Sequence, residues 1–260
     1  MKNIFLLFCL LFFTVFMAWA QVIPPGLGDT KVASWLAVGI QQDLDTSRRG
    51  WSSSTYVGMA RMSSPDTYNM LEKPGVFIFN QEFKHDFHED WEYSLAFSYR
   101  RQNEYNDQAP FEKDDPRLKQ EFRLYGRFSR IFKISSIEIT PTLRQEYQKY
   151  YTPDFEVHDE KTRLRSRFRM KIALPLTADK KHKLSFYSEQ LFSTSLKNEP
   201  REWTSFAYKD SRFSLYYSLS PETIPWTINL GYMNNLVGRK NVSSAHYLGV
   251  DFIWKNPFSR

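Results

Sequence analysis

Hydrophobic and polar residues alternate along most of the chain, and segment 163–172 shows the pattern most clearly. Its odd-numbered positions are all basic and most of its even-numbered positions are apolar, in the order Arg-Leu-Arg-Ser-Arg-Phe-Arg-Met-Lys-Ile. Successive side chains of a β-strand point to opposite faces of a sheet. The segment is therefore predicted to be a strand with one cationic face and one apolar face.

The same two-residue period recurs in segments 91–100, 137–146, 212–219, 226–232 and 247–254. In the first of these, one face carries Trp91, Tyr93, Leu95, Phe97 and Tyr99. Aromatic residues often stand at the ends of such apolar faces, as interfacial girdles do, and no helical periodicity of similar length competes. The alternation favours an outer-membrane barrel, in which the apolar residues face lipid and the polar residues face the lumen.

Eleven candidate strands follow from this pattern. They are residues 33–43, 53–62, 76–87, 91–102, 117–129, 134–148, 162–175, 182–193, 206–219, 225–235 and 245–254. Because single-chain bacterial barrels have an even number of strands, we expect ten to twelve, with twelve preferred. The predicted fold is all-β, a single antiparallel transmembrane β-barrel over residues 33–258.

The links between these strands alternate in length. Short links fall at 88–90, 130–133, 177–181 and 220–225, and longer polar links fall at 103–116, 149–161, 194–205 and 237–244. Outer-membrane barrels have short periplasmic turns and longer external loops. The pattern therefore predicts that the last strand runs toward the periplasm.

The N-terminus is predicted to be a secretory signal peptide, residues 1–20. Lys2 provides the positive charge, residues 4–17 are almost entirely apolar, and Ala18-Trp19-Ala20 fits a cleavage site. Residues 21–32, which include two adjacent prolines, are expected to form an irregular arm. The only cysteine lies in the signal, so the mature chain has no disulfide. These features predict the bacterial outer membrane as the location, after cleavage near Ala20.

Composition alone does not separate a membrane barrel from a soluble periplasmic sandwich. The mean hydropathy is negative and 17% of the residues are aromatic. No run of about 18 apolar residues follows the signal, so no transmembrane helix is expected. The net charge of +6 arises mainly from residues along strand interiors rather than from one exposed patch, which argues against nucleic acid as a partner.

The predicted lumen carries most of the charged residues that could form a site. These candidates are Arg123, Arg127, Glu138, Arg144, Glu146, Arg163, Arg165, Arg167, Arg169, Glu189 and Arg212. One interpretation is a charge network that fills a narrow interior, where buried charges need partners. The other is a cationic constriction that binds or conducts small anionic solutes. The sequence leaves both open.

Other chemistry has little support. The five histidines form no spaced ligand pair, so neither a metal nor a cofactor is expected. Ser243 or Ser244 with His246 is the only nearby serine and histidine combination, and no third group is identifiable. We therefore predict no enzymatic activity. A lipid hydrolase or acyltransferase is the alternative.

Several short motifs resemble an uncharacterised family. They are Ser34-Trp35, Arg144-Gln145-Glu146, Arg163-Leu164-Arg165, Glu189, Arg212 and Gly231-Tyr232. Over about residues 34–254 the chain is similar to domain of unknown function 2490, a family of small outer-membrane barrels frequent in Bacteroidetes. The resemblance implies an architecture and a location but no activity. We expect a structural or partner subunit of an envelope assembly, in contact with outer-membrane lipid and other envelope proteins. The alternative is a narrow, porin-like barrel that prefers or binds anions.

Overall fold

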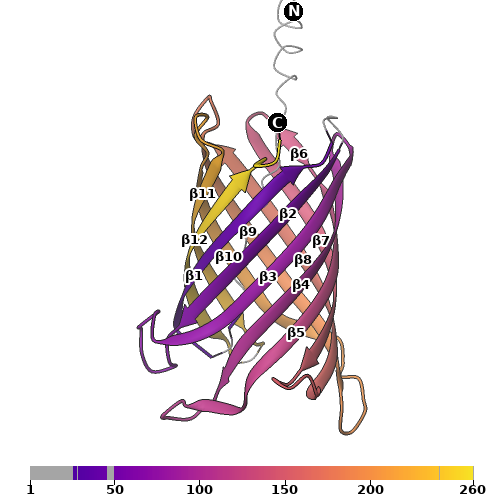
Figure 1. Ribbon diagram of the computed structural model, residues 1–260, viewed down its shortest axis with the longest axis vertical. Coiled ribbons are helices and arrows are strands. Elements are labelled where there is room, and N and C mark those ends of the chain that lie inside the picture. The colour runs from indigo at the N-terminus through magenta and orange to yellow at the C-terminus, as the bar shows by residue number, and fades with distance from the viewer. Residues whose placement is uncertain (1–25, 28, 46–49, 240, 260) are drawn as a thin grey trace, which may run out of the picture.

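The structure is a computed structural model that describes residues 26–27, 29–45, 50–239 and 241–259, and it is an all-β barrel (Figure 1). The strands are β1 (Val32–Asp43), β2 (Trp51–Met62), β3 (Lys73–His88), β4 (Trp91–Tyr105), β5 (Lys113–Arg130), β6 (Phe132–Ile134), β7 (Ile137–Tyr151), β8 (Val157–Pro175), β9 (His182–Lys197), β10 (Ala207–Leu219), β11 (Trp226–Val237) and β12 (Ser243–Lys255). Among these described residues, none forms a helix that is long and apolar enough to cross a membrane.

Eleven of the strands close the barrel, and the short β6 continues β5 along the edge of β7. Neighbouring strands are antiparallel, with the exception of β1 and β12, which pair in parallel over Val32–Gln41 and His246–Lys255. A closed ring with an odd number of strands requires one parallel pair, because strand direction otherwise alternates around it.

The eleven segments predicted from the alternation correspond one to one to the eleven strands of the ring. The predicted range of ten to twelve strands is therefore confirmed. An even number of strands is not required in this ring, because the parallel β1–β12 pair closes it without a further strand.

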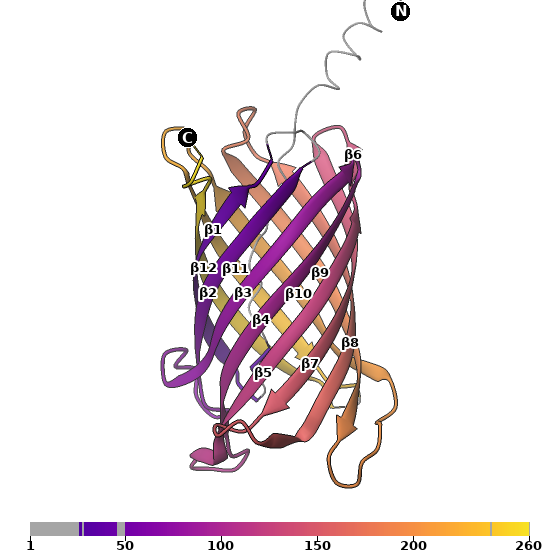
Figure 2. The ribbon, with the colours of Figure 1, turned by 45° about the vertical axis from the view of Figure 1, so that its right-hand side comes forward.

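The barrel has two different ends. The links after β1, β3, β6, β8 and β10 lie at the end where the chain finishes, and we call this the turn end (Figure 1). The links after β2, β4, β7, β9 and β11 lie at the opposite end, the loop end, where hairpins project beyond the barrel (Figure 2). The links predicted as short fall at the turn end and those predicted as long fall at the loop end.

Several strands are longer at the loop end than the sequence pattern suggested. β5 begins at Lys113 instead of residue 117, β8 begins at Val157 instead of 162, and β9 ends at Lys197 instead of 193. Backbone pairing continues there although the outward residues have become polar. The alternation of apolar residues, on which the prediction rested, ends before the strands do.

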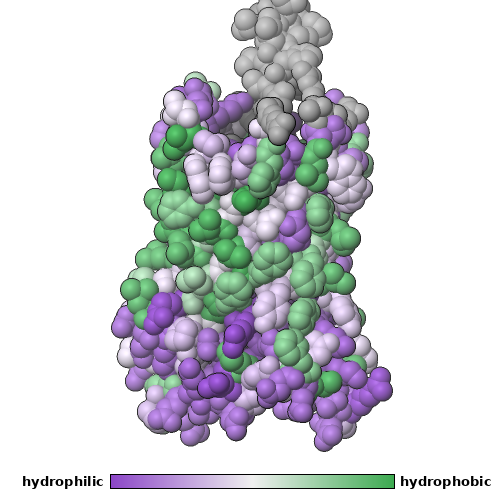
Figure 3. All heavy atoms as spheres, viewed as in Figure 1, coloured by the Kyte–Doolittle hydropathy of each residue, from purple (hydrophilic) through white to green (hydrophobic). Residues whose placement is uncertain are grey.

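Apolar side chains cover the outside of the barrel, and polar side chains fill the inside. On β4, Leu95 is 65% exposed, whereas its neighbours Ser94 and Ala96 are 6% and 3% exposed. In Figure 3 the hydrophobic residues gather in a band over the middle and upper part of the face shown, and hydrophilic residues cover the loop end. This is the inside-out arrangement that the alternation predicted.

The inner wall has an apolar side and a charged side. β1–β3, β11 and β12 contribute alanine, aliphatic, methionine and aromatic side chains to one buried cluster, in which Leu27 is 3% exposed. The Leu27 backbone N–H donates a 3.0 Å hydrogen bond to Tyr247 Oη. The described part of the predicted arm therefore packs inside the barrel. The predicted signal peptide lies outside the described residues.

Candidate functional site

All eleven candidate residues point into the lumen. Side chains two positions apart on a strand lie on the same face. On each strand, the candidate residues lie on the face that lines the lumen. The residues come from β5 (Arg123, Arg127), β7 (Glu138, Arg144, Glu146), β8 (Arg163, Arg165, Arg167, Arg169), β9 (Glu189) and β10 (Arg212). Five neighbouring strands thus form one charged wall.

Glu146 is the centre of this wall, and its side chain is fully buried. Its Oε1 lies 2.8 Å from Arg144 Nε and 2.5 Å from Arg167 Nε. Its Oε2 lies 3.5 Å from Arg123 Nε and accepts a 2.5 Å hydrogen bond from Gln148 Nε2. A buried carboxylate needs such compensation, and here three guanidinium groups converge on one acid.

Arg167 contacts carboxylates on both neighbouring strands. It pairs with Glu146 on β7, and its Nη1 lies 3.0 Å from Glu189 Oε1 on β9. Neither acid stands directly opposite Arg167 in the sheet, because Glu146 is paired in register with Arg165 and Glu189 with Arg169. Both carboxylates therefore incline toward the same guanidinium, which lies between them.

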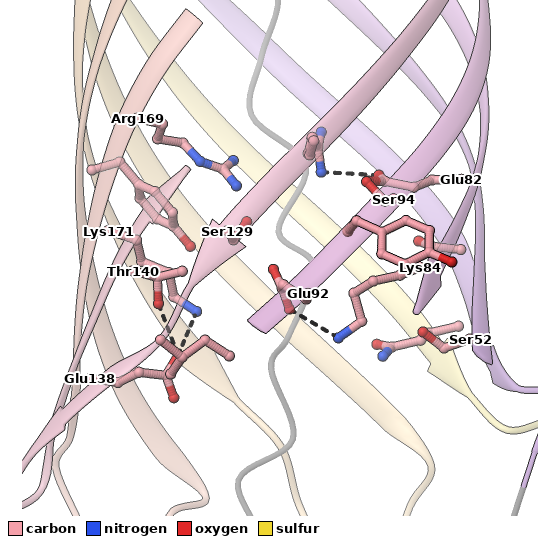
Figure 4. A pocket seen from close by; sticks show the side chains of 16 residues that line it. Ser52, Glu82, Lys84, Glu92, Ser94, Ser129, Glu138, Thr140, Arg169 and Lys171 are labelled. Atoms are coloured by element: carbon pink, nitrogen blue, oxygen red, sulfur yellow. Dashed lines mark hydrogen bonds and ion pairs between the residues drawn. The ribbon is translucent and has the colours of Figure 1, made fainter. Parts of the chain in front are cut away.

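Further ion pairs flank this centre. Four of these ion pairs involve arginine side chains, and they are Arg127 with Glu82 at 3.0 Å, Arg123 with Glu121 at 2.5 Å, Arg163 with Glu160 at 2.6 Å and Arg212 with Asp210 at 3.0 Å. Toward the turn end, Lys171 lies 3.4 Å from Glu138 and Lys84 lies 3.3 Å from Glu92 (Figure 4).

Five of these acids were not among the candidate residues, namely Glu82, Glu92, Glu121, Glu160 and Asp210. Asp210 lies two residues before Arg212 on the inner face of β10, so the alternation could have identified it. Glu160 fell within a segment predicted to be a loop, although it lies on β8 next to a register shift. A β-bulge changes which residues share a face, so a simple count of odd and even positions does not assign Glu160. No signal in the alternation marks this bulge.

Arg165 and Arg169 have no carboxylate within ion-pair distance in the described part of the chain, and their Nε atoms are buried without a hydrogen-bond partner there. In Figure 4, no hydrogen bond or ion pair joins Arg169 to the other residues drawn, whereas Lys171 and Lys84 are joined to acids. The Arg169 guanidinium lies 5.6 Å from the centre of the Tyr187 ring. Two cations of the wall are thus not neutralised by an adjacent acid.

Arg100 of β4 is a third such cation, and it contacts the arm instead of an acid. Its Nη2 donates a 2.6 Å hydrogen bond to the Gly26 carbonyl oxygen, and it also donates to Gln102 Oε1. A Cβ atom on Gly26 would lie 2.9 Å from Arg212 Nη2. A side chain at this position would therefore require the end of the Arg212 side chain to shift.

Three cavities follow one another along the lumen. The turn-end cavity has a volume of about 70 Å³, the central cavity about 60 Å³ and the loop-end cavity about 220 Å³. Arg169 lines both the turn-end and the central cavity, and Arg165 lines both the central and the loop-end cavity. Shared lining residues place the cavities next to each other.

The central cavity is strongly cationic. Its charged lining consists of two glutamates and eight arginines, namely Glu82, Glu189, Arg100, Arg123, Arg127, Arg144, Arg165, Arg167, Arg169 and Arg212. Charges interact more strongly in a confined, protein-lined space than in bulk water. Glu121, Glu146 and Asp210 pair with four of these arginines from outside the lining and reduce the excess of positive charge. A small anion in this cavity would offset the excess that remains.

Ser244 and His246 lie on β12 at the loop end, on exposed positions of the outer face. Ser244 Oγ accepts a 2.7 Å hydrogen bond from Asn234 Nδ2, and Tyr232 Oη lies 2.7 Å from His246 Nδ1. Between the described serines at 243 and 244 and His246, no hydrogen bond forms. The described residues also contain no group of three or more acidic, histidine or cysteine side chains placed to hold a metal ion.

The model of the family described as "Protein of unknown function (DUF2490)" matches residues 33–246, which is most of the barrel. The matched range contains all eleven candidate residues of the lumen. The search of curated proteins finds no match.

Proposed function

This chain belongs to the DUF2490 family of proteins of unknown function, and we propose that it is an outer-membrane β-barrel whose lumen binds small anions. The proposal has two parts, a location and a ligand class. Each part rests on its own observation and has its own test.

The location is supported by the exposed apolar side chains around the closed barrel and by the sequence of residues 1–20. Exposed leucines, phenylalanines and valines of this number are unfavourable in water, and a barrel that faces lipid gives them a suitable solvent. We expect the mature protein to fractionate with outer membranes and to migrate differently on gels before and after heating. Recovery as a soluble periplasmic monomer without detergent would contradict the location.

The ligand class is supported by one observation, the eight arginines and two glutamates that line the central cavity. Guanidinium groups bind oxyanions through paired, charge-assisted hydrogen bonds, and rings of basic side chains select for anions in pores. With about 60 Å³, the central cavity has room for a few water molecules or one small oxyanion. The ligand is therefore a small anion rather than a large solute.

The cavities favour binding or slow passage over an open channel. Their volumes are small, and Leu27 and Gly26 of the arm occupy part of the lumen. In planar bilayers with a KCl gradient, we expect at most a small conductance whose reversal potential indicates preference for chloride. Titration of the purified barrel with inorganic phosphate should show saturable binding.

A structural or partner subunit of an envelope assembly is the second candidate. The ion pairs around Glu146 favour it, because a network of this kind fills a barrel interior and stabilises it without any ligand. This candidate predicts no saturable phosphate binding and no anion-selective conductance, and it predicts copurification with other envelope proteins. The absence of enzymatic activity remains a prediction.

A further inference from the structure

We propose that the lumen holds two separate oxyanion positions, one at Arg165 and one at Arg169, and that Arg167 keeps both open by binding the two carboxylates that would otherwise neutralise them. The inference rests on the proposed function. It adds which arginines bind the anions, how many anion positions there are, and why no carboxylate of the protein occupies these positions.

The basic residues of β8 alternate between paired and unpaired side chains. Arg163 pairs with Glu160 and Lys171 pairs with Glu138. Arg167, in the middle, pairs with two acids. Arg165 and Arg169, which stand between these three, have no carboxylate within ion-pair distance among the described residues.

The sheet register makes this pattern unexpected. Glu146 stands directly opposite Arg165 across the β7–β8 pair, and Glu189 stands directly opposite Arg169 across the β8–β9 pair. Opposite charges that face each other on neighbouring strands normally interact. Here both acids turn to Arg167, whose flat guanidinium donates a 3.4 Å hydrogen bond from Nη2 to Glu146 Oε2 and a 3.0 Å hydrogen bond from Nη1 to Glu189 Oε1. One forked cation can serve two acids in this way because its donors point in different directions.

The two unpaired arginines are accessible from the cavities. Arg165 borders the central and loop-end cavities, together with Arg100, which also has no carboxylate partner among the described residues. Arg169 borders the central and turn-end cavities. Arg169 lies four positions after Arg165 along β8, which places their Cα atoms about 13 Å apart. Both line the central cavity, but Arg165 alone of the two lines the loop-end cavity and Arg169 alone lines the turn-end cavity, so each guanidinium has a cavity of its own and defines its own position.

The ligand class follows from the geometry of a free guanidinium beside a small cavity. Its parallel N–H groups fit two oxygens of one phosphate, sulfate or carboxylate group. The two positions lie in series along the lumen, an arrangement that also permits an anion to pass from one to the next. The same chemistry would suit free phosphate or the phosphate of a larger molecule, and the probe chosen below is inorganic phosphate.

Replacing Arg167 tests the inference, because it leaves in place both arginines that would bind the anions, Arg165 and Arg169. In Arg167→Gln, Glu146 keeps its contacts with Arg144 and Arg123, and Glu189 keeps a contact with Arg212 at 3.9 Å. Both acids lose their shared partner and become able to pair with Arg165 and Arg169, which face them in register. We expect phosphate affinity of the mature protein in detergent, measured by titration calorimetry, to fall at least tenfold. The triple variant R167Q/E146Q/E189Q should recover binding because the competing acids are gone. Arg101→Gln, an exposed position on the outer face of β4, is the control for loss of one positive charge.

Single substitutions at the two positions give a second test that does not depend on how Arg167→Gln folds. Arg165→Gln and Arg169→Gln should each reduce the stoichiometry of phosphate from two to one, and the double variant should bind none. If the wild-type barrel binds no phosphate, the proposed function itself is wrong. If the wild-type protein binds phosphate but stoichiometry and affinity stay unchanged in Arg167→Gln, Arg165→Gln and Arg169→Gln, the two-position inference is overturned and the lumen binds anions elsewhere.

Discussion

Trp35 Nε1 on β1 donates a 3.0 Å hydrogen bond to Asp251 Oδ1 on β12, although 216 residues separate the two in sequence. The bond crosses the parallel strand pair that closes the barrel. Asp251 is completely buried, and Trp35 is 3% exposed. A parallel pair is slightly less stable per residue than an antiparallel one, so a buried side-chain bond across this seam reinforces its weakest backbone pairing.

Trp35→Phe should therefore destabilise the barrel. The substitution keeps an aromatic ring but removes the indole donor, and Asp251 remains buried. We expect the free energy of unfolding to fall by about 1–3 kcal/mol, measured by urea titration in detergent micelles. Trp254→Phe is the control, because Trp254 is 39% exposed on the outer face and should change stability far less. Equal effects of the two substitutions would show that the seam bond contributes little.

The direction in which side chains face can be tested on β4. Phe97 is 39% exposed on the outer surface, and the adjacent Ser98 is 5% exposed and lines the central cavity. Phe97→Arg should impair assembly, because a cation at the lipid midplane costs about 2–4 kcal/mol. Ser98→Asn should assemble normally. The readout is the heat-modifiable folded band on gels, and similar yields of both variants would reverse the assignment of the two faces.

Gly231 provides space for a buried tyrosine on the neighbouring strand. A Cβ atom at this position would lie 2.2 Å from Tyr216 Cε1. Gly231→Ala should therefore destabilise the barrel by about 1–3 kcal/mol through overpacking. Gly126→Ala is the matched control, because the nearest atom to its Cβ would be Ser94 O at 3.5 Å. Urea titrations of the two variants should differ clearly, and a stable Gly231→Ala barrel would mean that the Tyr216 ring can move aside at little cost.

The loop between β2 and β3 should respond to acid through Glu72. Hydrogen bonds from Ser64 and Thr67 lower the pKa of Glu72 from 4.5 to about 2. A carboxylate whose pKa is depressed by folding stabilises the folded loop above its unfolded pKa, and this contribution is lost as pH falls from about 4.5 to about 2. Hydrogen exchange at Ser64 N–H should therefore accelerate, relative to the intrinsic rate, between pH 5 and pH 3. Glu72→Gln should lack this pH dependence.

The positions of the strands and the facing of their side chains could be predicted from the sequence, because both follow from a two-residue period. The segments around Leu95 and Phe168 show it without interruption, and both residues are exposed as expected. The parallel closure of β1 on β12 could not be predicted, since alternation within a strand carries no information about which strands are neighbours. The same applies to the ends of β8, where pairing continues beyond the apolar residues.

The membership of the charged lumen could be predicted, but its partner choices could not. All four arginines of β8 were placed correctly on the inner face. Of the four, Arg167 alone pairs with acids on neighbouring strands, while Arg163 pairs with Glu160 on its own strand. The strand register places Glu146 opposite Arg165, yet the Glu146 carboxylate contacts Arg167. Such choices depend on side-chain conformations, which a pattern of residue types does not specify.

The central claim is that small anions bind in the lumen beside arginines without a carboxylate partner. Crystals of the mature barrel soaked in bromide, measured at the bromine absorption edge, would locate bound anions directly by anomalous scattering. The account predicts peaks within hydrogen-bonding distance of the Arg165 and Arg169 guanidinium groups, and the loss of each peak in the corresponding glutamine variant. A lumen without anomalous peaks, or bromide bound solely on the outside of the barrel, would contradict it.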